Sequence, residues 1–390
     1  MKRLFFASIF VALGLMSGSA KYNPDTENIY EKSRHRTEII IPQVNGYNCY
    51  KADLHVHSIY SDGEVTPELR VLEAWEDGLD IMAMTDHIES RRQERSMLKF
   101  LKNYLPDKKG FEPINTRCSR GVPADERGII SDLNFSYSLA AKAAEAYPEL
   151  LIIHGAEITQ EPVKIGHYCV LFTKDNNTIY DRNPLQSLRN ARAQGALITH
   201  NHPGWERTSV DITDFEKQAY KEGLIDGIEV VNGRAFYPKI VRRAVERKFY
   251  MVAATDAHKP TTDLFNSLGC FRNMTLIFAK DKSEASLREA LLARRTLCYG
   301  GGLVIGEESL LRDLFHASVS CEKVWESGGK RVFVFTNNSS IEYHIVLDNQ
   351  PHTIPAHGKL SVTTKAEEAH IVVKNMLHLD RKELETTLKY

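Results

Sequence analysis

The chain has 390 residues, of which 42% are hydrophobic, and its 50 lysines and arginines nearly balance its 51 aspartates and glutamates, for a formal net charge of −1. This composition is typical of a globular protein, and the lack of a basic excess argues against a dedicated nucleic-acid binder. The length exceeds the ~250 residues that one core usually supports, so we expect one large domain and a smaller one.

Residues 1–20 have the layout of a secretory signal. Lys2 and Arg3 precede an apolar run at residues 4–16, and the small residues of 17–20 follow it. The run is shorter than the ~20 residues that a membrane-spanning helix needs. We therefore expect an exported protein, periplasmic or secreted, with no membrane span once residues 1–20 are removed and with residues 21–47 as an N-terminal extension.

Residues 48–302 alternate short, β-rich apolar runs with amphipathic segments. The expected strands are residues 50–56, 80–85, 150–158, 167–172, 196–200, 227–231, 250–255 and 274–279. The expected helices are residues 66–77, 132–146, 184–194, 214–222, 238–247 and 283–295. Thr66 and Ser283 are placed as hydroxyl N-caps. Strands separated by helices predict a largely parallel sheet, which forms a barrel if it closes, with its chemistry at the carboxyl ends of the strands.

Residues 89–130 interrupt this alternation with a stretch rich in charge, glycine and proline. The stretch carries many basic residues, from Arg91 to Arg120, and directly follows Asp86 and His87. Loops of this length are often functional, so its basic side chains are candidates to meet an anionic substrate. An ordinary solvated surface segment is an equally good interpretation.

Residues 303–390 change to alternating strand-like runs separated by turn residues. The expected strands are residues 317–321, 332–336, 341–347, 360–364 and 370–373. We expect a small C-terminal antiparallel β-sandwich domain. The alternation of Phe333, Phe335 and Tyr343 is typical of core residues.

Histidines and acidic residues gather at the ends of the apolar runs. The clusters are His55-Val56-His57, Thr85-Asp86-His87, His200-Asn201-His202 and Asp256-Ala257-His258, with Glu157 and His167 between them. Residues two apart in a strand point the same way, so each pair is expected to face one place. Imidazole and carboxylate hold zinc, manganese or iron, and this set is too large for one four-coordinate ion. The pattern therefore predicts a multinuclear metal centre. The six cysteines have no paired spacing and are not expected to be ligands.

In order and context, these motifs closely resemble those of the PHP (polymerase and histidinol phosphatase) superfamily. The resemblance rests on residues 55–63, Thr85-Asp86-His87, Gly155-Ala156-Glu157, His202-Pro203-Gly204 and Asp256-Ala257-His258, and it covers about residues 48–300. It implies an α/β fold, a distorted (β/α)7 TIM-like barrel, with phosphoester hydrolysis at two or three divalent ions.

The resemblance also assigns roles to single residues. One metal would be bound by His55, His57, Glu157 and Asp256; Glu157 would bridge to a second metal held by His167 and His202; and Asp62, His87 and His258 would form a third position. Asp62 stands where some relatives have histidine. The His-Pro dipeptide, a mark of the family, favours His202 over His200 as the ligand.

Other polar residues near these motifs are expected to assist. His200 is a candidate for substrate contact or proton donation, and Asp86 is expected to orient the ligands. Arg207 and Arg234 follow strand ends, so each is either a phosphate-binding arginine or an ordinary exposed one. His154 is interpreted as a strand-core histidine.

The implied function is metal-dependent hydrolysis of a small anionic phosphomonoester or phosphodiester by a hydroxide generated between zinc, manganese or iron ions. A nucleic-acid polymer is not expected as a partner. A carboxyl or carbamate ester hydrolase is the alternative within enzymes, because such a hydroxide also attacks carbonyl carbon. A non-catalytic, metal-stabilised module that binds a glycan or a protein partner is the alternative outside enzymes.

Overall fold

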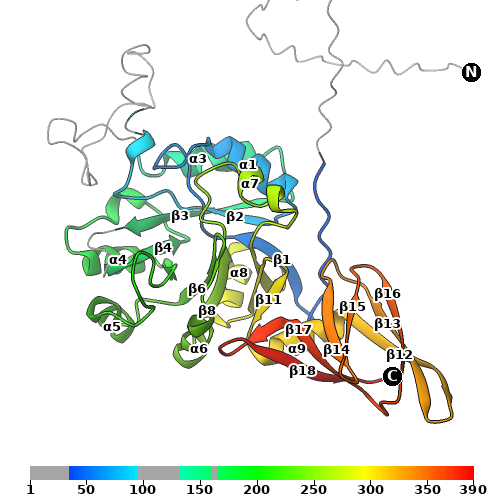
Figure 1. Cartoon of the computed structure of the whole chain (residues 1–390). Helices are drawn as coiled ribbons and strands as arrows, with labels where there is room; N and C mark the ends of the chain where they lie inside the picture. The colour runs from blue at the N-terminus through cyan, green and yellow to red at the C-terminus, as the bar shows by residue number, and fades with distance from the viewer. Residues whose placement is uncertain (1–34, 95, 97–131, 160–164) are drawn as a thin grey trace, which may run out of the picture. The chain divides into compact units, whose positions relative to one another are not determined.

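The backbone is built around one large mixed β-sheet to which strands from nearly the whole described chain contribute (Figure 1). The computed structural model describes residues 35–94, 96, 132–159 and 165–390. The expected signal at residues 1–20 and most of the insertion at residues 89–130 lie outside the described residues. Within the described part, residues 36–390 form one compact unit.

Short helices alternate with the strands up to residue 292. The helices that lie wholly within the described residues are α1 (Pro67–Glu76), α3 (Phe135–Ala144), α4 (Pro184–Ala193), α5 (Asp214–Lys221), α6 (Pro238–Arg247), α7 (Thr261–Leu264), α8 (Glu284–Leu292) and α9 (Glu308–Ser318), with 3-10 turns η2 (Asn176–Thr178) and η3 (Asn266–Leu268). Thr66 and Ser283 accept backbone hydrogen bonds from Leu69 and Ser286, which confirms the two predicted helix starts. No helix in the described segments has the length and apolar character needed to cross a bilayer.

The strands that were predicted up to residue 279 are all present. They are β1 (Asn48–Asp53), β2 (Ile81–Met84), β3 (Leu151–Thr159), β4 (His167–Leu171), β5 (Leu197–Asn201), β6 (Gly227–Asn232), β8 (Tyr250–Ala254) and β9 (Met274–Ala279). Three further strands were not expected: β7 (Ala235–Phe236), β10 (Thr296–Gly300) and β11 (Leu303–Gly306).

The prediction of a largely parallel sheet is wrong, because the sheet is mixed. β1, β2 and β3 run parallel, as do β5, β6 and β8, but β4 is antiparallel to both of its neighbours and β9 is antiparallel to β1 and β10. The connection between β3 and β4, residues 160–166, is too short for the crossover that a parallel pair requires.

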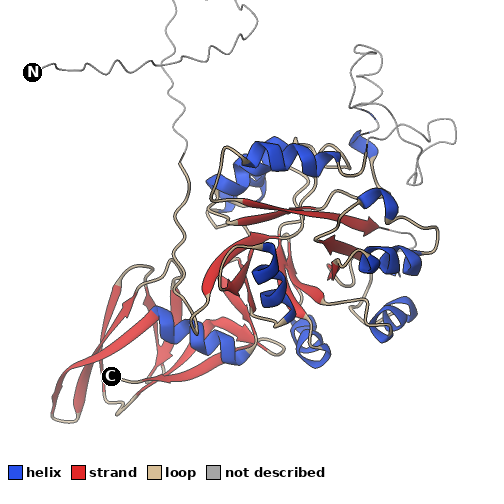
Figure 2. Ribbon diagram, turned by 180° about the vertical axis from the view of Figure 1, so that it is seen from behind, coloured by secondary structure: helices blue, strands red, loops and turns tan. Residues whose placement is uncertain are grey.

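The two ends of this strand series meet through side chains. The N–H of Ala253 on β8 donates to the Thr275 hydroxyl at 3.0 Å, and the N–H of Met251 donates to the Thr296 hydroxyl at 3.1 Å. Thr275 and Thr296 lie on β9 and β10. The views from opposite sides in Figures 1 and 2 show the helices outside this curved sheet.

The C-terminal region is antiparallel β-structure, as predicted, preceded by α9, which was not. Its strands are β12 (Val319–Ser327), β13 (Lys330–Asn337), β14 (Tyr343–Leu347), β15 (Gln350–Ile354), β16 (Lys359–Thr364), β17 (Ala369–His378) and β18 (Lys382–Leu388). β12, β13 and β16 form a separate sheet, whereas β17 pairs in parallel with β11 of the large sheet. Phe333, Phe335 and Tyr343 are fully buried in one core, which confirms that prediction.

Candidate metal centre

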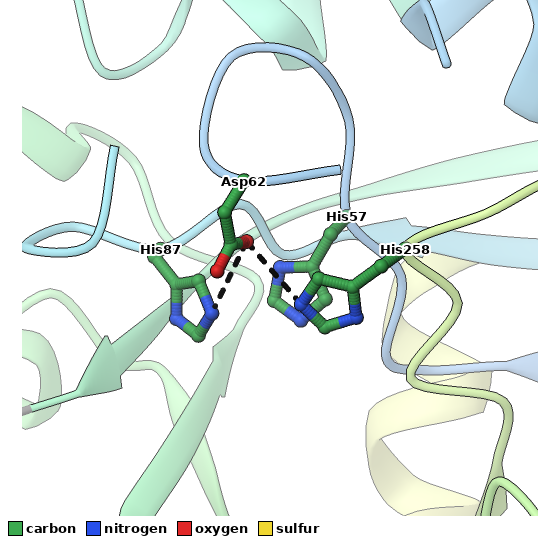
Figure 3. Close-up of side chains that lie close together, drawn as sticks. All are labelled: His57, Asp62, His87 and His258. Atoms are coloured by element: carbon green, nitrogen blue, oxygen red, sulfur yellow. Dashed lines mark ion pairs between the residues drawn. The ribbon is translucent and has the colours of Figure 1, made fainter. Parts of the chain in front are cut away.

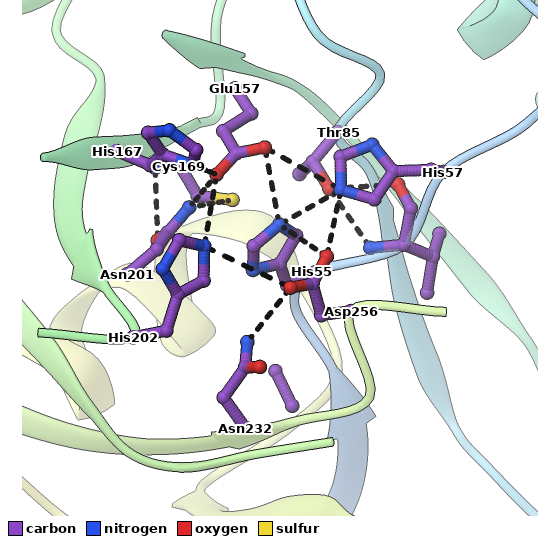
Figure 4. Close-up of polar contacts among 12 residues, drawn as sticks. His55, His57, Thr85, Glu157, His167, Cys169, Asn201, His202, Asn232 and Asp256 are labelled. Carbon is purple, nitrogen blue, oxygen red and sulfur yellow. Dashed lines mark hydrogen bonds and ion pairs between the residues drawn. The ribbon is translucent and has the colours of Figure 1, made fainter. Parts of the chain in front are cut away.

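The predicted ligands converge at one edge of the large sheet (Figures 3 and 4). This edge holds the carboxyl ends of the parallel strands, so β1 leads directly to His55 and His57, β2 to His87, and β8 to Asp256 and His258. The remaining ligands reach the same edge: Glu157 near the end of β3, His167 at the start of the antiparallel β4, His202 just after β5, and Asp62 in the loop that follows His57.

Nine side chains form four overlapping groups in which the possible ligand atoms all lie within 4.8 Å of one another. The groups are His55, His57 and Glu157; His55, His202 and Asp256; Glu157, His167 and His202; and His57, Asp62, His87 and His258. Because Glu157 belongs to two groups and His57 to two, the groups are continuous. The nine residues are the nine that the sequence selected.

The contacts within these groups are those of ligands that face a common ion. The Nε2 atoms of His55 and His57 are 3.0 Å apart, and Asp256 Oδ1 lies 3.0 Å from the His57 Nε2 and 3.3 Å from the His55 Nε2. Buried Glu157 Oε2 and Asp62 Oδ1 approach imidazole nitrogens without hydrogen-bond geometry. Such nitrogen and oxygen donors suit zinc, manganese or iron, so this donor set fits the implied ions.

Asp62 closes the outer group, in which three imidazoles surround one carboxylate (Figure 3). Its Oδ1 is 3.3 Å from the Nε2 of His258 and 3.4 Å from the Nε2 of His87. The His57 ring stacks on the ring of each of these two histidines, with a centroid distance of 4.3 Å to both, and the centroids of His87 and His258 are 6.1 Å apart. The carboxylate of Asp62 therefore lies close enough to the three imidazoles to share one metal ion with them.

The electrostatics favour the metal-binding protonation state at Glu157, Asp256 and His57. At two other donors they act the opposite way: against the effect of burial, Asp256 raises the pKa of His55, and Glu157 raises that of His87 to about 9. Burial opposes ionisation of Glu157, yet the positive fields of His87 and His55 hold its pKa well below the ordinary value. Burial likewise opposes ionisation of Asp256, and His55 outweighs it to lower that pKa. Burial, with His258 and His87, lowers the pKa of His57 to about 4. Ionised carboxylates and a neutral imidazole are the forms that coordinate a cation.

Two of the nine residues have a left-handed backbone. His202 has φ of +24° and Asp256 has φ of +50°, although neither is glycine. Such conformations cost on the order of 1–3 kcal/mol and persist where the surroundings fix them. The Asp256 N–H donates to the His55 carbonyl at 2.9 Å, and the His202 N–H donates to Glu229 at 2.6 Å. Backbone strain is thus stored at two proposed ligands.

Glu229 is a buried residue of the site that the sequence interpretation missed. Its Oε1 accepts from His55 Nδ1 at 2.8 Å, which turns the Nε2 of His55 toward the other donors, and its Oε2 accepts from Asn232 at 2.9 Å. Carboxylates placed behind a ligating histidine fix its tautomer and orientation. The available signal was one glutamate inside the apolar run Gly227–Asn232.

We expect Glu229→Gln to weaken metal binding by roughly 10- to 100-fold, because the amide cannot serve His55 and the His202 N–H as a charged acceptor. Metal titration with a competing chelator measures this affinity. Glu216→Gln is the matched control at another fully buried glutamate, and it should keep the wild-type affinity. Equal affinities for wild type and Glu229→Gln would show that Glu229 only packs.

Other polar side chains hold the donors from behind. Asn201 donates to Glu157 Oε1 at 2.7 Å, and the Thr159 hydroxyl lies 2.6 Å from His87 Nδ1. Asp86 accepts from the Ser58 N–H at 2.7 Å and from the hydroxyls of Ser58 and Ser61. Asp86 therefore fixes the loop that carries Asp62, and its contact with the ligand set is indirect.

Two buried arginines brace the backbone below the donors. Arg70 donates to the carbonyls of His57, Ala257 and Lys259, so one side chain ties the segments after β1 and β8 together. Arg272 pairs with Asp53 at 2.6 Å. Asp53 also accepts from Thr255, next to Asp256. These contacts position the two segments from which five of the nine donors come: His55, His57, Asp62, Asp256 and His258.

The structure places His200 on the opposite side of β5 from the donors. Its Nδ1 is 2.8 Å from the Tyr220 hydroxyl on α5, its Nε2 is 3.4 Å from Glu216, and its ring stacks on Tyr168. The expectation that His200 and His202 face the same way is wrong, because β5 ends at Asn201 and the left-handed backbone of His202 breaks the strand alternation.

The two arginines proposed for phosphate binding are also outside the donor groups. Arg207 lies five residues after His202 and pairs with Glu216 at 2.9 Å, whereas exposed Arg234 donates to the Leu264 carbonyl at 3.2 Å. His154 stacks on Tyr137 with centroids 4.2 Å apart, as a strand-core histidine does.

Comparison with known proteins points to one family. The PHP domain pattern matches residues 53–267. A two-domain protein from Bacteroides vulgatus, described as containing a predicted PHP-like metal-dependent phosphoesterase, is 29% identical, with a TM-score of 0.79 over 92% of this chain and 100% of that one. A search of curated proteins found no match.

More distant structures are also similar. An amidohydrolase from Chromobacterium violaceum is 16% identical, with a TM-score of 0.37 over 55% of this chain and 89% of that one. A lesion-specific endonuclease from Pyrococcus furiosus is 17% identical, with a TM-score of 0.38 over 72% of this chain and 64% of that one.

Proposed function

This chain belongs to the PHP domain family, and from that premise we propose that it hydrolyses a small phosphoester with two or three divalent metal ions held by the nine donors. The observation that supports the proposal most directly is the continuous set of buried imidazoles and carboxylates around Glu157. The 29% identical PHP-like relative, which this chain matches over 92% of its length, supports the same activity.

We assign zinc, manganese or iron ions to the donors in the arrangement that was expected from the sequence. His55, His57, Glu157 and Asp256 would hold one ion, and Glu157 would share a second with His167 and His202. Asp62, His87 and His258, which contact one another, would hold the third. When bound, such ions supply Lewis acidity and make water nucleophilic at neutral pH.

The residues around the donors hold them in fixed orientations. Glu229 and Thr159 fix the ring orientations of His55 and His87, so that donor atoms do not need to reorganise as negative charge develops on phosphoryl oxygens. Arg207, on the same turn as His202, is the better placed arginine for a phosphate oxygen, and Arg234 is the second candidate. Proton donation by His200 stays a prediction. Both nitrogens of its ring face side chains of α5, those of Tyr220 and Glu216.

The remaining parts of the sequence interpretation belong to this proposal as well. We propose that the curved sheet is the family's distorted (β/α)7 barrel, supported by the threonine-mediated contacts of β8 with β9 and β10. We also propose the division into a signal (1–20), an extension (21–47), a barrel (48–302) and a C-terminal sandwich (303–390), with export to a periplasm or beyond. The absence of a nucleic-acid substrate likewise stays a prediction.

Metal removal tests the proposal. We expect a chelator to abolish hydrolysis of phosphomonoesters or phosphodiesters, and manganese or zinc to restore it. Since ions bind only the folded donors, metal at 100 times its dissociation constant should add about 2.7 kcal/mol to the free energy of unfolding. A phosphate-release screen measures the hydrolysis, thermal melts measure the stabilisation, and elemental analysis measures the metal that is bound in each case.

The screen distinguishes the alternatives. It includes carboxyl esters, a carbamate and a DNA oligonucleotide beside sugar, nucleotide and amino-acid phosphates. Preferred turnover of the carboxyl ester or carbamate would favour the alternative hydrolase. A protein that binds and is stabilised by metal, yet turns over none of these compounds, would favour the non-catalytic binding module.

A further inference from the structure

An exposed tryptophan stands directly beside two of the proposed ligands. The Trp205 side chain is 45% exposed, and its ring centroid lies 5.1 Å from that of His167 and 5.6 Å from that of His202. An exposed tryptophan forgoes the stabilisation that burial of its large apolar surface would give. A large aromatic surface left open at a polar site therefore calls for an explanation by function.

The turn that carries Trp205 is closely determined. The Trp205 N–H donates to the His202 carbonyl at 3.0 Å, and the Arg207 N–H donates to the Gly204 carbonyl at 2.9 Å. Gly204 has φ of +90°, and a Cβ there would meet the Ser209 carbonyl at 2.8 Å, so this position requires glycine. Arg207 is anchored in turn by Glu216. The indole is thus presented at a fixed place relative to His202.

The space around the indole decides how a ligand can meet it. The cavity lined by Trp205, His167, His202 and Arg207 has a volume of about 10 Å³, which is room for roughly one water molecule. A ring-sized group does not fit in this cavity, whereas the exposed surface of the indole is open to one. A flat aromatic group makes the largest contact with such a surface, by offset stacking.

We propose that Trp205 determines substrate specificity by stacking on an aromatic ring in the alcohol part of the phosphoester, while the phosphoryl group lies at the nine donors. This inference rests on the proposed function and deepens it, because it narrows the substrate to a phosphoester whose alcohol part carries an aryl or heteroaryl ring. The polar donors attract the anionic end of such a molecule, and the indole contacts its apolar end.

Binding of two matched, non-hydrolysable probes tests the proposal. Phenylphosphonate and cyclohexylphosphonate carry the same charge and rings of similar size, but only the phenyl ring is flat and aromatic. In calorimetric titrations of the metal-loaded protein, Trp205→Leu should weaken phenylphosphonate binding about 10-fold, which corresponds to about 1.4 kcal/mol, and change cyclohexylphosphonate binding less than twofold. Trp205→Phe, which keeps an aromatic ring, should retain most of the affinity.

Trp325→Leu is the matched control, because Trp325 on β12 is 48% exposed and lies in the separate C-terminal sheet. It should bind both probes as the wild type does. Equal losses for the two probes in Trp205→Leu, or no loss for either, would overturn the proposal. So would a loss of metal from Trp205→Leu, since the indole would then act by supporting His167 and His202.

The same titrations separate this proposal from the one on which it rests. If the wild type binds metal and hydrolyses phosphoesters but shows no preference for the phenyl probe, only the stacking role of Trp205 is wrong. If the metal-loaded wild type neither binds any phosphonate nor hydrolyses any phosphoester, the proposed phosphoesterase function fails, and the specificity role fails with it.

Discussion

Glu157→Gln is expected to reduce kcat/KM by roughly 10³-fold, because Glu157 belongs to two donor groups and its loss removes an anionic ligand from both. Metal ions contribute several kcal/mol of transition-state stabilisation, and each 1.36 kcal/mol is a factor of ten in rate. Glutamine keeps the size of the side chain but offers one neutral oxygen. The bound metal per protein, measured by elemental analysis, should fall together with the rate.

The control for this change is Glu73→Gln, at a buried glutamate that pairs with Arg70 at 2.8 Å. Its metal content should equal that of the wild type. A Glu157→Gln protein with full metal content and unchanged turnover would remove Glu157 from the centre and leave the assignment of the two inner ions without support.

Asp53→Ala is expected to lower the free energy of unfolding by about 3 kcal/mol, the lower end of the usual cost of breaking a buried ion pair, because Arg272 keeps its second pairing with Asp77 at 3.2 Å. Asp53 and Arg272 are almost completely buried and pair at 2.6 Å. Burial disfavours the charged form of Arg272, yet Asp53 and Asp77 raise its pKa. The guanidinium stays charged when Asp53 is gone, because an arginine side chain is not deprotonated in proteins. Urea unfolding of the metal-free protein measures the loss without a contribution from the ions.

Two comparisons identify the cause. Asp53→Ala combined with Arg272→Met removes both charges and should recover part of the lost stability. Glu308→Ala, which breaks the exposed pair with Arg312 on α9, should cost no more than about 0.5 kcal/mol. A cost below about 1 kcal/mol for Asp53→Ala alone would show that the buried pair is not the brace described above.

Apart from the short elements β7 and α7, the strands and helices described above up to residue 292 could be predicted, because each is a local pattern of apolar spacing and capping residues. Strand direction could not, since it depends on which strands pair: β9 runs antiparallel to β1 over the register Asn48–Ala279 to Ala52–Thr275. β10 and β11 were missed because they follow a helix closely and are joined through Gly301 and Gly302, which look like a break in the sequence.

The nine donors could be predicted because histidines and acids recur at strand ends in a pattern with a family resemblance. The residues that support them could not. Glu229 is a single polar residue in an apolar run and Asn201 lies between two histidines, and the side chains that they contact are 174 and 44 residues away in the sequence. His200 misled for a related reason: spacing by two implies one face only while the strand continues, and β5 stops at Asn201.

The parallel pairing of β11 with β17, at Val304–Met376 and Ile305–Leu377, has a consequence for how this architecture can be rearranged. One hydrophobic core runs through both sides of residue 302, from Phe278 to Phe315 and Tyr343. The C-terminal strands are therefore not an independent unit. Cutting the chain after residue 302 would expose the unpaired edge of the sheet, and exposed strand edges promote self-association. An exchange of the C-terminal strands between homologues would have to preserve the hydrogen-bond register between β11 and β17 as well as the sequence on each side of residue 302.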